Sequence, residues 1–159
     1  VDIKMLISQV VKKLTPIANA KDIVIYVDNH QAEFSPILLD YDKMYEAIYN
    51  IADNAIKYSP EGGFVHIDIT ADNDYLTIKI EDNGPGIPED ERDRIFERFY
   101  RLDDSRARDT GGTGLGLAIT KEAVLMHNGT IDVANVSDIG SVFTIRLPYK
   151  ITIGGQNEK

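Results

Sequence analysis

Residues 41–58, YDKMYEAIYNIADNAIKY, hold the clearest helical pattern in the sequence and decide its fold class. Apolar residues recur along this stretch in alternating steps of three and one, so in a helix they form one continuous apolar face. We therefore predict a helix over residues 40–58 that lies on a hydrophobic core. The apolar face comprises Met44, Ala47, Ile48, Ile51, Ala52, Ala55 and Ile56.

Helices and strands are interleaved along the rest of the chain. Helical spacing is found over residues 1–20 and 114–126, and the charged stretch 88–99 is also predicted to be helical. Asn128-Gly129 suits a left-handed helix cap. Alternating apolar residues predict strands at 23–27, 65–69, 76–80, 130–136 and 141–147, with a hairpin turn at 72–74 and a loop at 102–112. This order predicts an α+β fold, a two-layer α/β sandwich with a mixed, largely antiparallel sheet packed against helices.

Length and composition place the chain among single-domain globular proteins. Its 159 residues are 43% hydrophobic and 27% charged, and we predict one domain over 1–150 with a loose tail over 151–159. The net charge of -9 opposes binding to nucleic acid or to an anionic membrane surface. The lack of cysteine excludes disulfides and thiol chemistry. The longest apolar run, residues 23–27, is too short for a bilayer, so we expect no membrane segment and no secretion signal.

The polar side of the 40–58 helix is the first candidate for chemistry. Four polar residues spaced by four, four and three positions form one stripe along it. Asparagine is unfavourable inside a helix, which suggests that a function compensates for it. One amide oxygen could ligate a hard cation such as Mg²⁺, with a lysine near phosphate oxygens. The alternative is an ordinary solvated helix face. The stripe comprises Glu46, Asn50, Asn54 and Lys57.

Residues 82–87, DNGPGI, are the second candidate. Strand alternation places Asp82 on the apolar face of the preceding strand, so its carboxylate points to the core. A buried carboxylate needs hydrogen-bond donors, and the exocyclic amino group of a purine is a suitable one. The alternative is a plain turn, because Asn-Gly is a strong hairpin signal. The residues that follow begin a helix instead of a returning strand, and this argues against the hairpin.

A glycine-rich segment at residues 111–117, GGTGLGL, opens the predicted 114–126 helix. Glycine lets backbone N–H groups approach an anion closely, and a helix N-terminus favours negative charge. A phosphate cradle and a flexible hinge explain this segment equally well. It is not a P-loop, because the chain contains no Gly-Lys pair, and Leu117 stands where the dinucleotide-binding motif has its last glycine.

Arginine is concentrated just before these glycines, with six of the seven arginines in residues 92–108 among many acidic residues. Most of them fit a self-neutralising solvated surface. Arg106 and Arg108 differ, because they directly precede the glycines and could fold over a bound polyphosphate. No metal-ligand spacing links the histidines, which we interpret as structural or solvent-exposed. The histidines are His30, His66 and His127.

Four motifs in this order resemble the catalytic and ATP-binding domain of sensor histidine kinases. They are residues 50–58 (NIADNAIKY), 82–87 (DNGPGI), 95–101 (IFERFYR) and 112–117 (GTGLGL). The series resembles the N, G1, F and G2 boxes of the GHKL (Bergerat-fold) ATPase superfamily, and the resemblance covers nearly the whole chain. It implies the Bergerat ATP-binding fold, with ATP and Mg²⁺ as ligands.

The resemblance also implies a role for each matching residue. Asn54 would coordinate Mg²⁺ with Asn50 beside it, and Lys57 would contact the phosphates. Asp82 would accept a hydrogen bond from the adenine amino group. Residues 101–111 would form a lid over ATP, anchored by aromatic residues of the third motif, Phe96 and Phe99. The other residues placed in the nucleotide pocket are Tyr58, Gly84, Gly86, Ile87, Phe99, Gly112, Thr113, Gly114, Leu115, Gly116, Leu117 and Ser141.

The implied reaction is transfer of the γ-phosphoryl group of ATP to a histidine on a separate dimerisation domain, with a response regulator as a further partner. Such transfer would rest on positioning and on charge neutralisation by Mg²⁺, Lys57 and Arg106. Asn50 stands where ATP-hydrolysing relatives typically have a glutamate that activates water, and an amide cannot act as that base. We therefore expect slow hydrolysis. Asp53 remains open as an alternative base.

Two features depart from the family pattern. Residues 138–141, DIGS, keep only one glycine of a last Gly-x-Gly-Ser/Thr box. No histidine of the chain is followed by an acidic residue, as the family's phosphoacceptor is. We therefore expect a fragment of a longer protein, typically membrane-attached with this domain in the cytoplasm. The alternatives are a GHKL ATPase, a non-catalytic ATP-sensing module and a serine kinase of the anti-sigma type.

Overall fold

The structure is a computed structural model. It describes residues 1–87, 89–92, 94–97, 116–135 and 140–149, together with the backbone of two short strands at 152–153 and 156–157. Its helices are α1 (Ile3–Ala20), α2 (Tyr41–Tyr58), the 3-10 helix η1 (Glu89–Glu91) and α4 (Gly116–Met126). Its strands are β1 (Val24–Asp28), β2 (Phe64–Ala71), β3 (Tyr75–Asp82), β4 (Thr130–Asn135), β5 (Ser141–Pro148), β6 (Thr152–Ile153) and β7 (Gln156–Asn157).

The main sheet has five strands in the order β1-β2-β3-β5-β4. β1 runs parallel to β2, and each of the other neighbouring pairs is antiparallel. The predicted hairpin between β2 and β3 is confirmed, because the Asp72 carboxylate accepts hydrogen bonds from the backbone N–H groups of Asp74 and Tyr75. β6 and β7 form a separate two-stranded antiparallel sheet.

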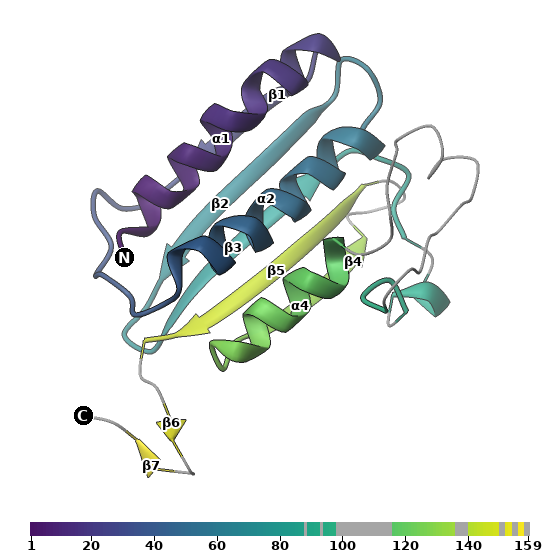
Figure 1. The fold of residues 1–159 in the computed structure, drawn as a ribbon. Coiled ribbons are helices and arrows are strands. Elements are labelled where there is room, and N and C mark those ends of the chain that lie inside the picture. Colours follow the sequence, from purple (N-terminus) through teal and green to yellow (C-terminus); the bar gives the residue numbers. More distant parts are fainter. Residues whose placement is uncertain are drawn as a thin grey trace.

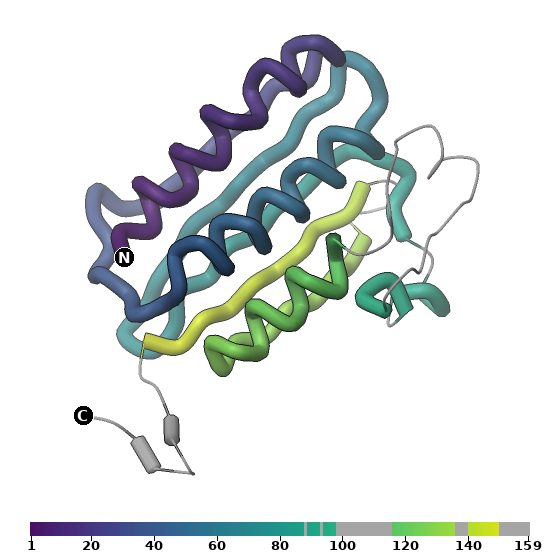
Figure 2. The backbone as a smooth tube through the Cα atoms, in the orientation of Figure 1, coloured from purple at the N-terminus to yellow at the C-terminus, as the bar shows by residue number. Residues whose placement is uncertain are grey.

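The helices α1, α2 and α4 lie side by side over one face of the main sheet, as Figures 1 and 2 show. Alternate residues of β2 and β3 are buried beneath them, which is the pattern expected of a sheet with one covered face. The predicted fold class, a two-layer α+β sandwich with a mixed, largely antiparallel sheet, is confirmed. None of the helices in the described part of the chain is long and apolar enough to cross a membrane.

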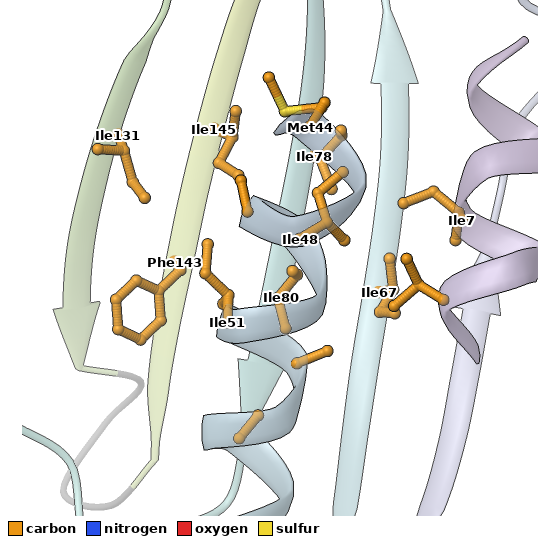
Figure 3. Close-up of a cluster of buried hydrophobic side chains, with 14 of the residues drawn as sticks. Ile7, Met44, Ile48, Ile51, Ile67, Ile78, Ile80, Ile131, Phe143 and Ile145 are labelled. Atoms are coloured by element: carbon orange, nitrogen blue, oxygen red, sulfur yellow. The ribbon is translucent and has the colours of Figure 1, made fainter. Parts of the chain in front are cut away.

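The core lies between α2 and the middle of the sheet. Ile48 and Ile51 on α2 are fully buried and lie over Ile78 and Ile80 of β3 (Figure 3). Asp40 is the N-cap residue of α2, and its carboxylate accepts a hydrogen bond from the Lys43 N–H. The apolar residues of α2 thus determine which face is buried, and the polar residues lie on the remaining faces.

Two predictions about the connecting segments have different outcomes. The left-handed cap is confirmed, because Asn128 has a φ of 60° and the Gly129 N–H donates to the carbonyl of Val124. The prediction of a helix over 88–99 is wrong for the residues described there, which form η1 and hydrogen-bonded turns. Ile95 is the one buried residue among them, so the described segment lacks the apolar stripe that holds a helix onto a sheet.

Candidate nucleotide site

The predicted site residues meet at one end of the sheet. The C-terminal half of α2, the segment that follows β3, the start of β5 and the first turn of α4 come together there (Figure 1). These four segments lie far apart in the sequence, and the antiparallel pairing of β3 with β5 brings Asp82 opposite Ser141. The fold therefore assembles one polar site from separate motifs.

Asp82 ends β3 with its side chain in the core, as the strand alternation predicts. Only 5% of this residue is exposed. One carboxylate oxygen accepts a hydrogen bond from the Gly84 N–H at 2.8 Å, and the other accepts one from the Ser141 hydroxyl at 3.2 Å. Burial raises the pKa of the Asp82 carboxyl, and these donors offset only part of that cost. A buried acidic group held this way is typical of a binding site.

Glycine is required where the segment after β3 turns across α2. A Cβ on Gly84 would lie 2.7 Å from the carbonyl oxygen of Tyr58, so no larger residue fits without moving the end of α2. Gly84 in turn accepts a hydrogen bond from the Gly140 N–H at 2.6 Å. Gly140 has a φ of +85°, and a Cβ there would lie 2.5 Å from the Asp82 carbonyl oxygen. The retained glycine of the DIGS sequence therefore packs directly against the site.

Asn135, at the end of β4, is a residue of this region that the motifs do not mark. Its side-chain oxygen accepts a hydrogen bond from the Ile87 N–H at 2.9 Å. The same oxygen would lie 3.1 Å from a Cβ on Gly86, whose φ is +83°. Asn135 thus fixes the chain where it leaves the DNGPGI motif. No local signal could have indicated this contact, because the two residues are 48 positions apart.

The polar face of α2 meets α4 through Asn50. Its side-chain N–H donates to the Gly116 carbonyl at 3.3 Å, in the first turn of α4. The buried Thr120 hydroxyl reinforces this contact, because it lies within hydrogen-bond distance of the carbonyls of Ala47 and Gly116. These hydrogen bonds join α2 to the helix that follows the glycine-rich segment, and Leu117 in the first turn of that helix is half-buried.

Asn54 lies one helical turn beyond Asn50 and is half-buried. In the part of the chain that the structure describes, its side-chain amide has no hydrogen-bond partner, so its oxygen is free to bind a ligand. Mg²⁺ prefers oxygen ligands and usually takes only one or two of them from the protein, the rest coming from phosphates and water. The Asn54 amide fits that requirement.

Lys57 forms an ion pair with Asp53, with Nζ and Oδ2 3.1 Å apart. Both side chains are half-buried, with Lys57 32% and Asp53 19% exposed. Lys21 supports this end of α2 by donating from Nζ to the carbonyls of Ile56 and Lys57. Asp53 is therefore already engaged as an ion-pair partner, which weakens it as a candidate general base.

Several predicted site residues lie outside the described residues. Of the lid anchors, Phe96 is described: its ring packs edge-on against Phe143, with the centroids 6.2 Å apart, and Lys121 lies over its face. The third motif is thus attached to β5 and α4 by its first aromatic residue. The predicted residues that lie outside the described part are Phe99, the lid residues 101–111 with Arg106 and Arg108, Gly112, Thr113, Gly114 and Leu115.

The structural interpretation of His127 is confirmed. Its Nε2 accepts a hydrogen bond from the Asp40 N–H at 2.9 Å, and its Nδ1 donates to the Ala123 carbonyl at 2.7 Å. The imidazole therefore joins the end of α4 to the start of α2. The Asp40 contact spans 87 positions and was not predictable from local pattern.

Comparison with known proteins agrees with this geometry. Residues 39–151 match the model of the family described as histidine kinase-, DNA gyrase B- and HSP90-like ATPase. The sensor histidine kinase WalK of Bacillus subtilis is 46% identical over 114 residues, covering 70% of this chain and 19% of WalK. The chain belongs to this ATPase family. Within it, the chain is the ATP-binding catalytic domain of a two-component sensor histidine kinase, and it spans about a fifth of that relative's length.

Solved structures of histidine kinases share the fold. The solved chain of the mycobacterial sensor histidine kinase MprB has a TM-score of 0.81 and 34% identity, and the match covers 93% of this chain and 96% of that solved chain. Full-length ShkA in complex with AMPPNP has a TM-score of 0.80 and 32% identity, covering 94% of this chain and 30% of ShkA. The solved ThkA chain in complex with the response regulator TrrA has a TM-score of 0.75, and the match covers 94% of this chain and 41% of that solved chain. Its 22% identity supports the fold alone.

Proposed function

We propose that this domain holds Mg²⁺–ATP for transfer of the γ-phosphoryl group to a histidine on a separate dimerisation domain of the same parent protein. The observation that carries the proposal is the buried Asp82 carboxylate at the end of β3, at the same end of the sheet as the C-terminal half of α2, which carries Asn50 and Asn54. The solved structure of full-length ShkA, which has the same fold, is a complex with the ATP analogue AMPPNP, and this supports a nucleotide as the ligand of the domain.

Asp82 is suited to recognise the adenine amino group. A carboxylate has about four lone-pair positions. The Gly84 N–H and the Ser141 hydroxyl donate to different oxygens, so each oxygen keeps capacity for a further donor. A purine amino group supplies that donor. Gly84 lets the segment after β3 pass close to the end of α2 beside the Asp82 carboxylate, because a Cβ there would lie 2.7 Å from the Tyr58 carbonyl oxygen.

The phosphates belong on the α2 side of the site. Asn54 would hold Mg²⁺, which when bound neutralises charge on the phosphate oxygens. Lys57 adds a positive charge one turn further along, and its ion pair with Asp53 keeps that charge oriented along the polar face of α2. The positioning of Lys57 by Asp53, and of the helix end by Lys21, prepares this face before nucleotide arrives.

The domain supplies position and charge, and the nucleophile comes from outside. Asn50 donates a hydrogen bond to Gly116 and has no basic group, so it cannot activate water. Asp53 is paired with Lys57. Water attack is therefore expected to be slow, while a histidine that reaches the γ-phosphate can react. A response regulator, as in the ThkA–TrrA complex, would then accept the phosphoryl group from that histidine. The parent protein would be membrane-attached, with this domain in the cytoplasm.

The test is phosphoryl transfer in trans. The chain is incubated with ATP labelled at the γ-phosphate and a panel of histidine-bearing helical hairpins, and phosphohistidine and free phosphate are both quantified. We expect acid-labile label on a hairpin histidine and little free phosphate. At subsaturating ATP, Asp82→Asn should slow transfer roughly 10- to 150-fold because it weakens nucleotide binding. The control Asp132→Asn, at an exposed position on β4, should keep the unaltered rate.

Two outcomes would overturn the proposal. Rapid release of free phosphate without an acceptor would instead indicate a hydrolytic ATPase of the same family. Tight ATP binding with no transfer to any hairpin would indicate a module that senses ATP without using it.

A further inference from the structure

A cluster of histidine and aspartate side chains lies on the face of the sheet that the helices leave uncovered. The parallel register of β1 and β2 places Asp28 opposite Asp68, and His66 lies two residues before Asp68 on the same face. Both β2 residues are half-buried and alternate with the buried Ile67 and Ile69, which face the helices. The cluster is therefore separate from the nucleotide site, which lies at the end of the helix layer.

Asp28, His66 and Asp68 bring their donor atoms close to one another. One ligand atom from each of Asp28, His66 and Asp68 lies within 4.8 Å of the other two. Atoms that close can contact one ion with small side-chain movements, because metal–ligand distances of about 2.0–2.2 Å place two ligands on one ion up to about 4 Å apart. The two strands hold these side chains by backbone pairing, so the arrangement does not depend on a loop.

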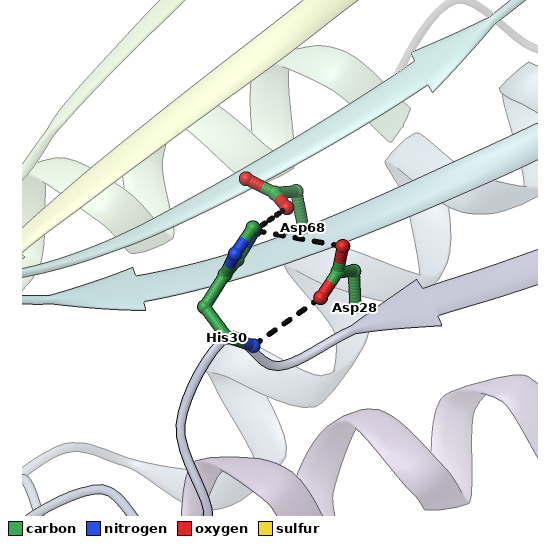
Figure 4. Close-up of polar contacts among 3 residues, drawn as sticks. All are labelled: Asp28, His30 and Asp68. Atoms are coloured by element: carbon green, nitrogen blue, oxygen red, sulfur yellow. Dashed lines mark hydrogen bonds and ion pairs between the residues drawn. The ribbon is translucent and has the colours of Figure 1, made fainter.

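A second histidine adds to the cluster from the segment after β1. The backbone at His30 has a φ of 59°, and its N–H donates to Asp28 Oδ1 at 3.3 Å, so the chain turns back over the sheet. The imidazole Nε2 contacts the Asp68 carboxylate and lies 3.7 Å from Asp28 Oδ2, as Figure 4 shows. His30 thus bridges the same two carboxylates that approach His66.

The chemistry of this donor set selects a class of ion. Two imidazoles and two carboxylates supply two nitrogen and two oxygen ligands with a total charge of about -2, which compensates a dication. Imidazole suits zinc and neighbouring transition metals, whereas Mg²⁺ and Ca²⁺ prefer oxygen ligands alone. The set therefore differs in kind from the amide oxygen of Asn54.

We propose that Asp28, His66 and Asp68 form a binding site for a divalent transition-metal ion, with Zn²⁺ as the representative ion and His30 as its fourth ligand. The ion would join the edge strand β1 to β2 and fix the segment that follows β1. In its absence, the contact of His30 with the two carboxylates holds the same groups together.

The strand next to the cluster sets the local charge. The register pairs His66 with Glu81 and Asp68 with Lys79, both on β3 and both on the uncovered face. One further acid and one base therefore flank the site. The two aspartates of the cluster supply the negative charge that favours a cation.

The test is calorimetric titration of the nucleotide-free chain with ZnCl₂, in a buffer that does not bind zinc. We expect one Zn²⁺ per chain, and excess Mg²⁺ should not displace it. His66→Gln and Asp68→Asn should each weaken binding at least tenfold, because each removes a ligand. His127→Gln, which lies outside the cluster, is the matched control and should leave the affinity unchanged.

The absorption spectrum of bound Co²⁺ distinguishes a residue that ligates the metal from one that only supports the fold. Co²⁺ replaces Zn²⁺ with similar geometry and gives visible absorption bands whose intensity depends on the ligand number. We expect His30→Gln to change those bands, and unchanged bands would overturn the role of His30 as fourth ligand. The whole proposal is overturned if the chain shows no saturable Zn²⁺ binding, or if His66→Gln and Asp68→Asn bind Zn²⁺ as the unaltered chain does. Circular dichroism checks that each variant is folded.

Discussion

Asp82→Asn should separate nucleotide binding from folding. The carboxylate is 5% exposed, and its pKa is raised because burial penalises the charged form. Asparagine has nearly the same shape, and its side-chain oxygen can still accept the hydrogen bond from the Gly84 N–H. Its amide nitrogen can donate to the Ser141 oxygen in place of the present contact. The substitution therefore removes a buried charge without leaving a buried donor unpaired.

The magnitudes follow from these contacts. At pH 7 the free energy of unfolding should stay the same or rise by up to about 1 kcal/mol, because a neutral side chain avoids the desolvation cost. Loss of a charge-assisted hydrogen bond to the adenine amino group should cost about 1.5–3 kcal/mol of binding energy, or roughly 10- to 150-fold in Kd. Asp82→Ala is the contrasting variant, since it leaves two buried donors unpaired and should lower the free energy of unfolding by about 1–3 kcal/mol.

The pH dependence has a defined sign. The folded-state pKa of Asp82 lies above its unfolded value, so the folded protein binds more protons between the two values. The contribution of Asp82 to stability is therefore fully present below the unfolded pKa and is lost as pH rises through the folded pKa. The stability advantage of Asp82→Asn should grow over the same window.

Urea unfolding at several pH values and calorimetric titration with a nucleotide measure both effects. If Asp82→Asn and Asp82→Ala lower the free energy of unfolding equally, the claim that burial of the charged carboxylate costs stability is refuted. If Asp82→Asn leaves the nucleotide affinity unchanged, the role of the carboxylate in binding is refuted.

Two further substitutions test contacts around the site. Gly140→Ala should lower the free energy of unfolding by more than Gly62→Ala in urea titrations. Both positions have a positive φ that costs about 1–2 kcal/mol with a Cβ, but of the two only Gly140 would place that Cβ 2.5 Å from a backbone oxygen. Equal losses in the two variants would contradict the effect of this close approach. His127→Ala should lower the free energy of unfolding by about 1 kcal/mol, since it removes the acceptor of the Asp40 N–H and the donor to Ala123. Met126→Ala, at a neighbouring exposed position, is the control, and a loss as large as that of His127→Ala would contradict the proposed link between α4 and α2.

Local pattern was enough to predict the elements that carry the site. The apolar stripe of α2 fixes which side faces the sheet, and this alone places Asn50, Asn54 and Lys57 on the opposite side. Period-two alternation in β3 likewise predicts that Asp82 is buried. In both cases one periodic face is packed against the core, so the orientation of the polar residues follows from the apolar ones.

Contacts between distant segments could not be predicted in the same way. Asn135 reaches Ile87, and His30 reaches Asp68, only because particular strands pair in a particular register. A single sequence shows the face on which a residue lies, but it does not show which distant residue shares that face. The histidines illustrate this limit: their spacing along the chain gave no sign of a metal site, although the fold brings two of them to the same pair of aspartates.

The segment after the DNGPGI motif shows a different limit. Its charged residues favour a helix locally, yet the described residues form η1 and turns. The Phe96 ring packs against Phe143, a residue of β5. Such tertiary contacts can outweigh the local helix propensity of a segment.

Calorimetric titration of the chain with a non-hydrolysable ATP analogue, with and without Mg²⁺, tests the nucleotide site most directly. The unaltered chain should bind one analogue per molecule, more tightly with Mg²⁺ than without it. Asn54→Ala should remove most of the Mg²⁺ effect while keeping the affinity seen without the ion, because Asn54 makes no hydrogen bond within the described residues that its loss would break. An affinity that does not respond to Mg²⁺, or a Mg²⁺ effect that persists in Asn54→Ala, would contradict the metal-binding role of α2, and the absence of binding by the unaltered chain would contradict the site itself.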